Sequence, residues 1–210
     1  MDAPPRKTAG LGEVLAEVRA RPASIERDSA LAEIAWAAIE SEPSVARDAC
    51  SALTPDCPER IRLVQHCAMR IAETDTEAAL KWANGLGSKA EISAATCQIA
   101  VVLAESDPVA AARMLAENGV EGRERDVAVV AVLQRWAATG PEDAAAWAAA
   151  FPDGQVRGAG IRAILSHWLA KDAAAATLWH QSITDQSLKD EVTDILAELR
   201  AGGTDGITPP

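Results

Sequence analysis

Arginine recurs at one position of a repeated pattern in this chain. Arg60, Arg125 and Arg157 each stand eleven residues before a large residue that opens a similar block of sequence, and Arg27 holds the matching place in an earlier, more divergent copy. A guanidinium group binds carboxylates and phosphates through paired, charge-assisted hydrogen bonds. If like positions stack along the molecule, these four arginines form a ladder of binding residues for a carboxylate-rich or phosphorylated segment of a partner.

A structural role for these arginines is the alternative. Each arginine can pair with an Asp or Glu of the neighbouring turn and so fix the spacing of the repeats. The series is also incomplete, because Ile92 stands at this position in one repeat and Lys189 occupies it in the final helix. Arg→Glu changes that leave every partner bound would contradict the binding ladder.

The four cysteines, Cys50, Cys57, Cys67 and Cys97, all lie in the first half of the chain, where His66 is a further possible metal ligand. A structural zinc site needs such side chains to converge tetrahedrally, often from closely spaced cysteine pairs. That spacing is absent, and Cys67 falls at a position that apolar residues fill in other repeats, so we expect it in the core. We expect reduced thiols. A Cys50–Cys57 disulfide in an oxidising compartment and a small metal- or thiol-dependent protein centred on Cys50, Cys57, His66 and Cys67 are the alternatives.

Residues for nucleophilic catalysis are not grouped in the sequence. A catalytic Cys or Ser needs a neighbouring base, but His66, His167 and His180 fall in different repeats. The Gly85–Gly87 and Gly158–Gly160 segments lack the strand and helix that flank a phosphate-binding loop. We therefore expect a protein that is not an enzyme and that carries no cofactor or metal.

Composition narrows the class of partner. The formal net charge of −11 repels nucleic acid phosphates. No apolar run is long enough to span a membrane, and the charged first residues are not followed by an apolar signal segment. We expect a cytoplasmic protein whose partner is another protein or a peptide, possibly acidic, with no role for nucleic acid or membrane.

Helices that repeat every 32–33 residues are expected to position these side chains. Blocks that open at Ile71, Leu103, Trp136 and Trp168 align without gaps, and the residues seven, four and three positions earlier share one helical face with the opening residue. Eight residues after the opening residue comes an alanine, and three residues further on comes a larger residue. These pairs are Ala79 and Trp82, Ala111 and Met114, Ala144 and Trp147, and Ala176 and Trp179. A small residue lets two helices approach closely. We expect the tryptophans to pack in the core rather than to form a ligand cage.

Turn residues divide each block into two helices. Asp and Pro residues in the segments around 75, 107–108, 140–143 and 172 are typical of helix N-termini. A short helix over 11–18, ending before Pro22, and a last helix over about 186–200 are expected at the ends of the array. The sequence thus predicts an all-α chain: a single α-solenoid domain over 10–202 with about five helix-turn-helix repeats between two capping helices. We expect residues 1–9 to be a flexible N-terminus and residues 203–210 to be a disordered tail.

A helix-turn-helix unit of this length resembles the tetratricopeptide family of α-solenoids over roughly residues 23–182. The resemblance is one of architecture, because the period differs and the family's Trp-Leu-Gly-Tyr positions are not matched. The block from Trp136 to Arg157 is similar to Ala/Trp-rich helical repeats of uncharacterised bacterial proteins. These resemblances imply a protein- or peptide-binding scaffold with a groove lined by the first or second helices of the repeats.

Overall fold

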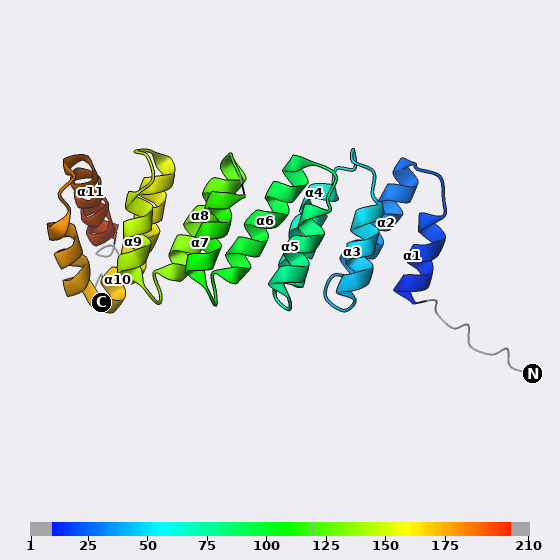
Figure 1. The fold of residues 1–210 in the computed structure, drawn as a ribbon, viewed down its shortest axis with the longest axis horizontal. Helices are drawn as coiled ribbons and strands as arrows, with labels where there is room; N and C mark the ends of the chain where they lie inside the picture. Colours follow the sequence, from blue (N-terminus) through cyan, green and yellow to red (C-terminus); the bar gives the residue numbers. More distant parts are fainter. Residues whose placement is uncertain (1–9, 119, 203–210) are drawn as a thin grey trace, which may run out of the picture. The chain divides into compact units, whose positions relative to one another are not determined.

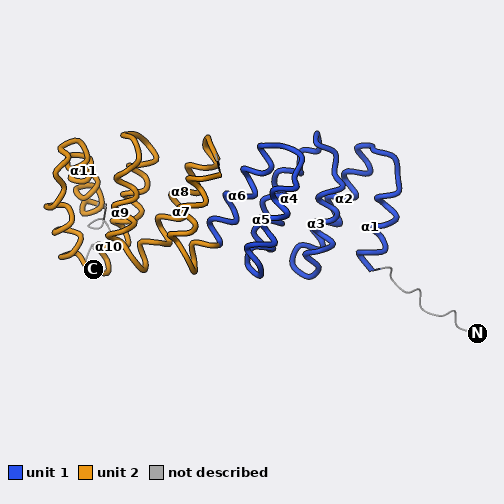
Figure 2. The backbone as a smooth tube through the Cα atoms, in the orientation of Figure 1, with its two compact units in different colours: residues 1–102 blue, residues 103–210 orange. Residues whose placement is uncertain are grey.

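The computed structural model describes residues 10–118 and 120–202 of the protein. Within these ranges the chain forms eleven helices and no strand (Figure 1), which confirms the all-α prediction. The chain divides into two compact units, residues 1–102 and 103–210 (Figure 2). The predicted flexible N-terminus, 1–9, and the predicted disordered tail, 203–210, lie outside the described residues. The prediction of a single domain over 10–202 stays a prediction.

Unit 1 is built from consecutive helices that pack against one another. The main contacts join helices that are neighbours or next neighbours in the sequence, so two layers of helices enclose a core between them. Leu31, Leu63 and Val64 are among its fully buried side chains. The helices are α1 (Leu11–Arg19), α2 (Ile25–Ala38), α3 (Pro43–Ala52), α4 (Arg60–Ala72), α5 (Thr76–Asn84) and α6 (Lys89–Leu103), the last of which ends at the first residue of unit 2.

Unit 2 follows the same plan, with larger side chains in its core. Leu133, Ile161 and Leu165 are fully buried, and Trp136 and Trp168 are buried beside them. The helices of this unit are α7 (Pro108–Glu117), α8 (Arg123–Trp136), α9 (Pro141–Ala149), α10 (Gln155–Ser182) and α11 (Gln186–Gly202).

Helix α10 contains the turn that the sequence predicts at Asp172. This residue has extended backbone angles, φ −152° and ψ 84°, so α10 consists of two helical segments joined by a kink. The carboxylate of Asp172 accepts a hydrogen bond of 2.9 Å from the backbone N–H of Ala175, which caps the second segment.

The same turn conformation occurs at five places. Its extended residues have φ between −136° and −155° and ψ between 65° and 99°, and successive ones stand 32 or 33 residues apart: Glu42, Asp75, Asp107, Gly140 and Asp172. Asp75 and Asp107 cap the following helix just as Asp172 does. Proline replaces the side-chain cap at the first position of α3 and α9, where a missing N–H costs no helical hydrogen bond.

An alanine follows each of these turn residues after four positions, and none of the five has any exposed surface. They are Ala46, Ala79, Ala111, Ala144 and Ala176. In the first helix of each repeat, the predicted positions seven, four and three residues before the opening residue are buried as well, as Val129, Val132 and Leu133 illustrate in α8. The opening residues Ile71 and Leu103 are partly exposed. The expectation for the tryptophans is confirmed only for Trp136 and Trp168; the other four are partly exposed.

No helix in the described part of the chain is both long enough and apolar enough to cross a membrane.

Candidate functional site

Each of the four predicted binding arginines has intramolecular contacts of its own. Arg27 and Arg60 belong to unit 1, whereas Arg125 and Arg157 belong to unit 2. The side chains of Arg60 and Arg157 are both only 9% exposed. Both pair with a carboxylate, as in the structural alternative, although Glu91 and Glu191 lie in helices rather than in turns. Binding by the four-residue ladder stays a prediction.

Arg60 stands at the start of α4 and holds three parts of unit 1 together. Its Nε donates to Glu91 Oε1 at 2.6 Å and its Nη2 donates to Glu91 Oε2 at 3.2 Å, so the pair is bidentate. Its Nη1 donates to the carbonyls of Cys50, at 3.3 Å, and of Leu53. Hydrogen bonding to the Arg60 guanidinium lowers the pKa of the Glu91 carboxyl, which keeps this buried acid charged.

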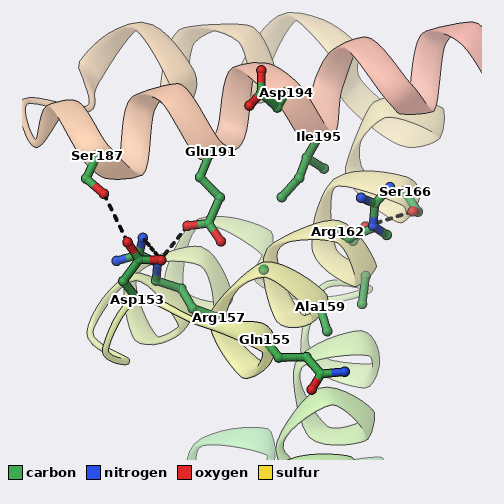
Figure 3. A pocket seen from close by; sticks show the side chains of 12 residues that line it. Asp153, Gln155, Arg157, Ala159, Arg162, Ser166, Ser187, Glu191, Asp194 and Ile195 are labelled. Carbon is green, nitrogen blue, oxygen red and sulfur yellow. Dashed lines mark hydrogen bonds and ion pairs between the residues drawn. The ribbon is translucent and has the colours of Figure 1, made fainter.

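Arg157 stands near the start of α10 and pairs with α11 (Figure 3). Its Nε donates to Glu191 Oε2 at 2.7 Å, and its Nη2 lies 3.1 Å from Asp153 Oδ1 in an ion pair. The Nη2 atom is buried but makes no hydrogen bond of good geometry within the described residues. The hydroxyl of Ser187 donates to Asp153 Oδ2 at 3.3 Å, which adds a second link between α11 and the segment before α10.

Two glycines make this arrangement possible. A Cβ atom at Gly158 would lie 2.9 Å from Glu191 Oε1, and one at Gly160 would lie 2.5 Å from Leu133 Cδ1. Gly158 thus leaves room for the carboxylate, and Gly160 lets α10 approach α8 closely. The Gly158–Gly160 segment, which does not fit a phosphate loop in sequence, has a packing role.

Arg27 and Arg125 are held more loosely. Arg27 Nη1 lies 3.7 Å from Asp28 Oδ1, and its buried Nε has no hydrogen-bond partner in the described residues. Arg125 lies 5.5 Å from the centre of the Phe151 ring, in a cation–π arrangement, and 4.0 Å from Asp126 Oδ1. The four positions share the arginine but not its contacts, because different residues surround each one.

No disulfide joins the four cysteines, which all lie in the described residues, and their arrangement differs from the possibilities raised by the sequence. Cys50 contacts Cys67, not Cys57: a hydrogen bond between the two buried thiols lowers the pKa of Cys50 and, together with burial, raises that of Cys67. Cys67 lies in the core, as predicted. His66 instead packs edge-on against Trp36, with ring centres 5.0 Å apart. In the described part of the chain, no group of three His, Cys, Asp or Glu side chains could hold a metal ion.

Two surface hollows surround the two buried arginines. The Arg157 hollow, of about 660 Å³, carries charges of both signs; its polar lining includes Asp153, Arg157, Arg162, Ser187, Glu191 and Asp194. The second, which we call the basic hollow, has a volume of about 510 Å³ and lies in unit 1. It is lined by Arg47, Ser51, Arg60, Ala78, Lys81, Trp82 and residues 85–87.

Sequence reasoning identified Arg60 but not Arg47 or Lys81. Arg47 lies on α3 and Lys81 on α5, and neither residue recurs at its position in the other repeats. The sequence therefore held no signal for their common location, which depends on how α3 and α5 pack on α4.

No protein-family model, curated protein or solved structure matches the chain significantly. The resemblance to tetratricopeptide repeats remains an expectation from the sequence.

Proposed function

We propose that this protein is a non-enzymatic helical-repeat scaffold that binds another protein or a peptide. The observation that carries the proposal is the fivefold recurrence of one turn conformation followed by one fully buried alanine. Repetition of this kind preserves the residues that pack helices together and leaves the exposed positions free to differ. Arrays of such units provide extended surfaces for partners.

The finer architecture is part of this proposal. Five hairpins, namely α2–α3, α4–α5, α6–α7, α8–α9 and the two segments of α10, would stack as one α-solenoid, with α1 and α11 as its ends. Support comes from the regular spacing of the turn residues, 32 or 33 positions along the chain. The buried alanine in each second helix also favours equivalent packing in every repeat.

The contacts among the polar residues favour binding over catalysis. Arg60 and Arg157 are engaged with carboxylates, and His180 bonds to the hydroxyl of Thr193 at 2.9 Å in a helix-to-helix contact. These groups join helices to one another. A partner would therefore be bound by the more exposed side chains around them.

A pull-down from lysate of the source cells, followed by calorimetry with the purified partner, tests the proposed function. We expect one partner to bind the native chain with a defined stoichiometry. A matched bait is Ala144→Asp, which places a charge at a fully buried helix contact and disrupts the α8–α9 pair. Retention of the same proteins by both baits, or of none by the native chain, would contradict a folded binding surface.

A further inference from the structure

The basic hollow is unusual for a chain of net charge −11, because three cationic residues line it and no carboxylate does. Other hollows of the structure include acids in their linings. The Arg157 hollow contains three, Asp153, Glu191 and Asp194, and a hollow beside α2 contains Asp28, Asp56 and Glu59. A hollow with only positive side chains in an acidic protein attracts an anion locally, against the overall field.

The three cations of the basic hollow differ in their availability. Arg60 is buried, and Glu91 neutralises it from within the protein. Arg47 is partly exposed and uses its Nε and Nη2 atoms on a single oxygen of Asp48, at 3.0 and 2.9 Å. Lys81 is exposed and has no ion-pair partner in the described part of unit 1. Lys81, which is unpaired in the described residues, and Arg47, whose charge is offset in part by Asp48, therefore line one cavity from two different helices.

The remaining lining is mainly apolar. The hydroxyl of Ser51 donates to the carbonyl of Arg47 at 2.8 Å and accepts from Trp82 Nε1 at 3.4 Å, which joins α3 to α5 beside the cations. Trp82 and Leu86 are partly exposed. A volume of about 510 Å³ accommodates one peptide side chain with part of its neighbour.

We propose that the basic hollow binds a phosphorylated side chain of a partner peptide, with the phosphate between Arg47 and Lys81 and an adjoining apolar residue against Trp82. This inference rests on the proposed function and specifies its ligand. A phosphomonoester carries a charge of about −2 at neutral pH and three acceptor oxygens, so it can bind Lys81 and also compete with Asp48 for Arg47 better than the single charge of a carboxylate can.

Titration of the isotopically labelled full chain with three peptides, followed by amide chemical shifts, tests this proposal. The peptides are identical except for a central phosphoserine, glutamate or serine, each flanked by leucine. We expect the phosphoserine peptide to shift the amides of residues 47–51 and 78–87 at up to millimolar concentration. The glutamate peptide should bind about tenfold more weakly, as expected for a lost charge-assisted hydrogen bond, and the serine peptide should leave these amides unchanged.

Variants identify the groups that bind. Arg47→Gln and Lys81→Gln should each lower the affinity for the phosphoserine peptide by about tenfold. Arg21→Gln should not, because this exposed arginine of the same unit lies outside the hollow and pairs with Glu17. Affinity should also fall as the pH is lowered through about 6, where the phosphate loses its second charge. Inorganic phosphate should displace the peptide.

Several results would overturn the proposal. These are equal affinity for all three peptides, unchanged amide chemical shifts at residues 78–87, or a loss of affinity in Arg21→Gln as large as in the two hollow variants. Failure of the proposed function is distinguishable from these results. A protein partner that binds the Arg47→Gln/Lys81→Gln variant as tightly as the parent would leave the scaffold standing and reject the phosphate site. A chain that binds the phosphoserine peptide but retains no protein partner would support the phosphate site and reject the scaffold.

Discussion

Arg60 and Arg157 occupy the same position of the repeat but differ in their surroundings. Arg60 forms a bidentate pair with Glu91, a carboxylate whose side chain is only 5% exposed, and its Nη1 donates to two backbone carbonyls. Arg157 pairs with Glu191, whose side chain is 21% exposed, and with the exposed Asp153. A repeat thus fixes where an arginine lies, whereas the neighbouring residues decide how strongly it is held and whether open charge remains beside it.

The exposed charges around Arg60 and Arg157 differ as well. In the Arg157 hollow, acids offset the arginines, and Arg162 is paired with Glu198. In the basic hollow, the buried Arg60–Glu91 pair leaves the exposed positions to Arg47 and Lys81. Arg47 is offset in part by Asp48, so the basic hollow differs from the Arg157 hollow mainly in the charge of Lys81, which is unpaired in the described part of the chain.

Replacing Arg60 by methionine should have the largest effect on stability. We expect a loss of about 3–5 kcal/mol in the free energy of unfolding, because the buried carboxylate of Glu91 is left unpaired. The matched change Arg157→Met should cost about 1–3 kcal/mol, because Glu191 can still be hydrated. Urea unfolding of both variants measures the difference, with the exposed Arg62→Met as control. Equal losses at the two positions would contradict the comparison.

The glycines beside Arg157 give the next largest effect. Gly160→Ala should destabilise the protein by about 1–3 kcal/mol, because the added Cβ overlaps the packed side chain of Leu133. Gly158→Ala should cost less, since the atom it meets is the end of the flexible Glu191 side chain. Thermal unfolding of the two variants measures both effects. A larger loss for Gly158→Ala would mean that the Arg157–Glu191 pair is more rigid than we infer.

Acid should weaken the Arg60–Glu91 pair. The pKa of Glu91 is lowered in the folded protein, chiefly by hydrogen bonding to Arg60, so its carboxylate stabilises the fold above its ordinary pKa of 4.5. That contribution is lost as the pH falls through the lowered value. The parent should therefore be more stable than Glu91→Gln at neutral pH, and this gap should narrow below pH 4.5. Urea unfolding at a series of pH values checks it; a constant gap would exclude the charge of Glu91 as the cause.

Thiol reactivity gives the smallest effect and reports on unit 1 alone, because all four cysteines lie there. Cys57 is partly exposed, whereas Cys50, Cys67 and Cys97 are buried. We expect one thiol per chain to react quickly with a maleimide under native conditions, and none in Cys57→Ser. Mass spectrometry counts the labels. Rapid labelling of more than one site in the parent would indicate that the region beneath Arg60 opens readily.

The helices and turns were largely predictable from sequence, because they depend on local signals. Asp75, Asp107 and Asp172 each accept a hydrogen bond from the backbone N–H three residues later, so the aspartate alone indicates where a helix begins. This holds even at Asp172, where the two segments of α10 follow each other directly. Four of the five buried alanines followed from periodicity alone; Ala46, in the more divergent first copy, did not. Whether the hairpins form one five-repeat solenoid stays a prediction.

The partners of the site residues could not be predicted, because they depend on packing between distant positions. Glu91 lies 31 residues from Arg60 and Glu191 lies 34 residues from Arg157, so no fixed offset identifies both. The short Cys50–Cys57 spacing suggested a pair, but helix packing brings Cys67 to Cys50 instead. Lys81 carried no signal, since a single exposed lysine is ordinary in any helix.

The five repeated turns also affect how the protein is made. The main helix contacts within each unit join elements that are neighbours or next neighbours in the sequence. Low contact order of this kind favours rapid folding, because little chain entropy is lost before a contact forms. A nascent chain can thus fold one hairpin at a time as it leaves the ribosome, so that apolar surface is covered within about one repeat length of synthesis.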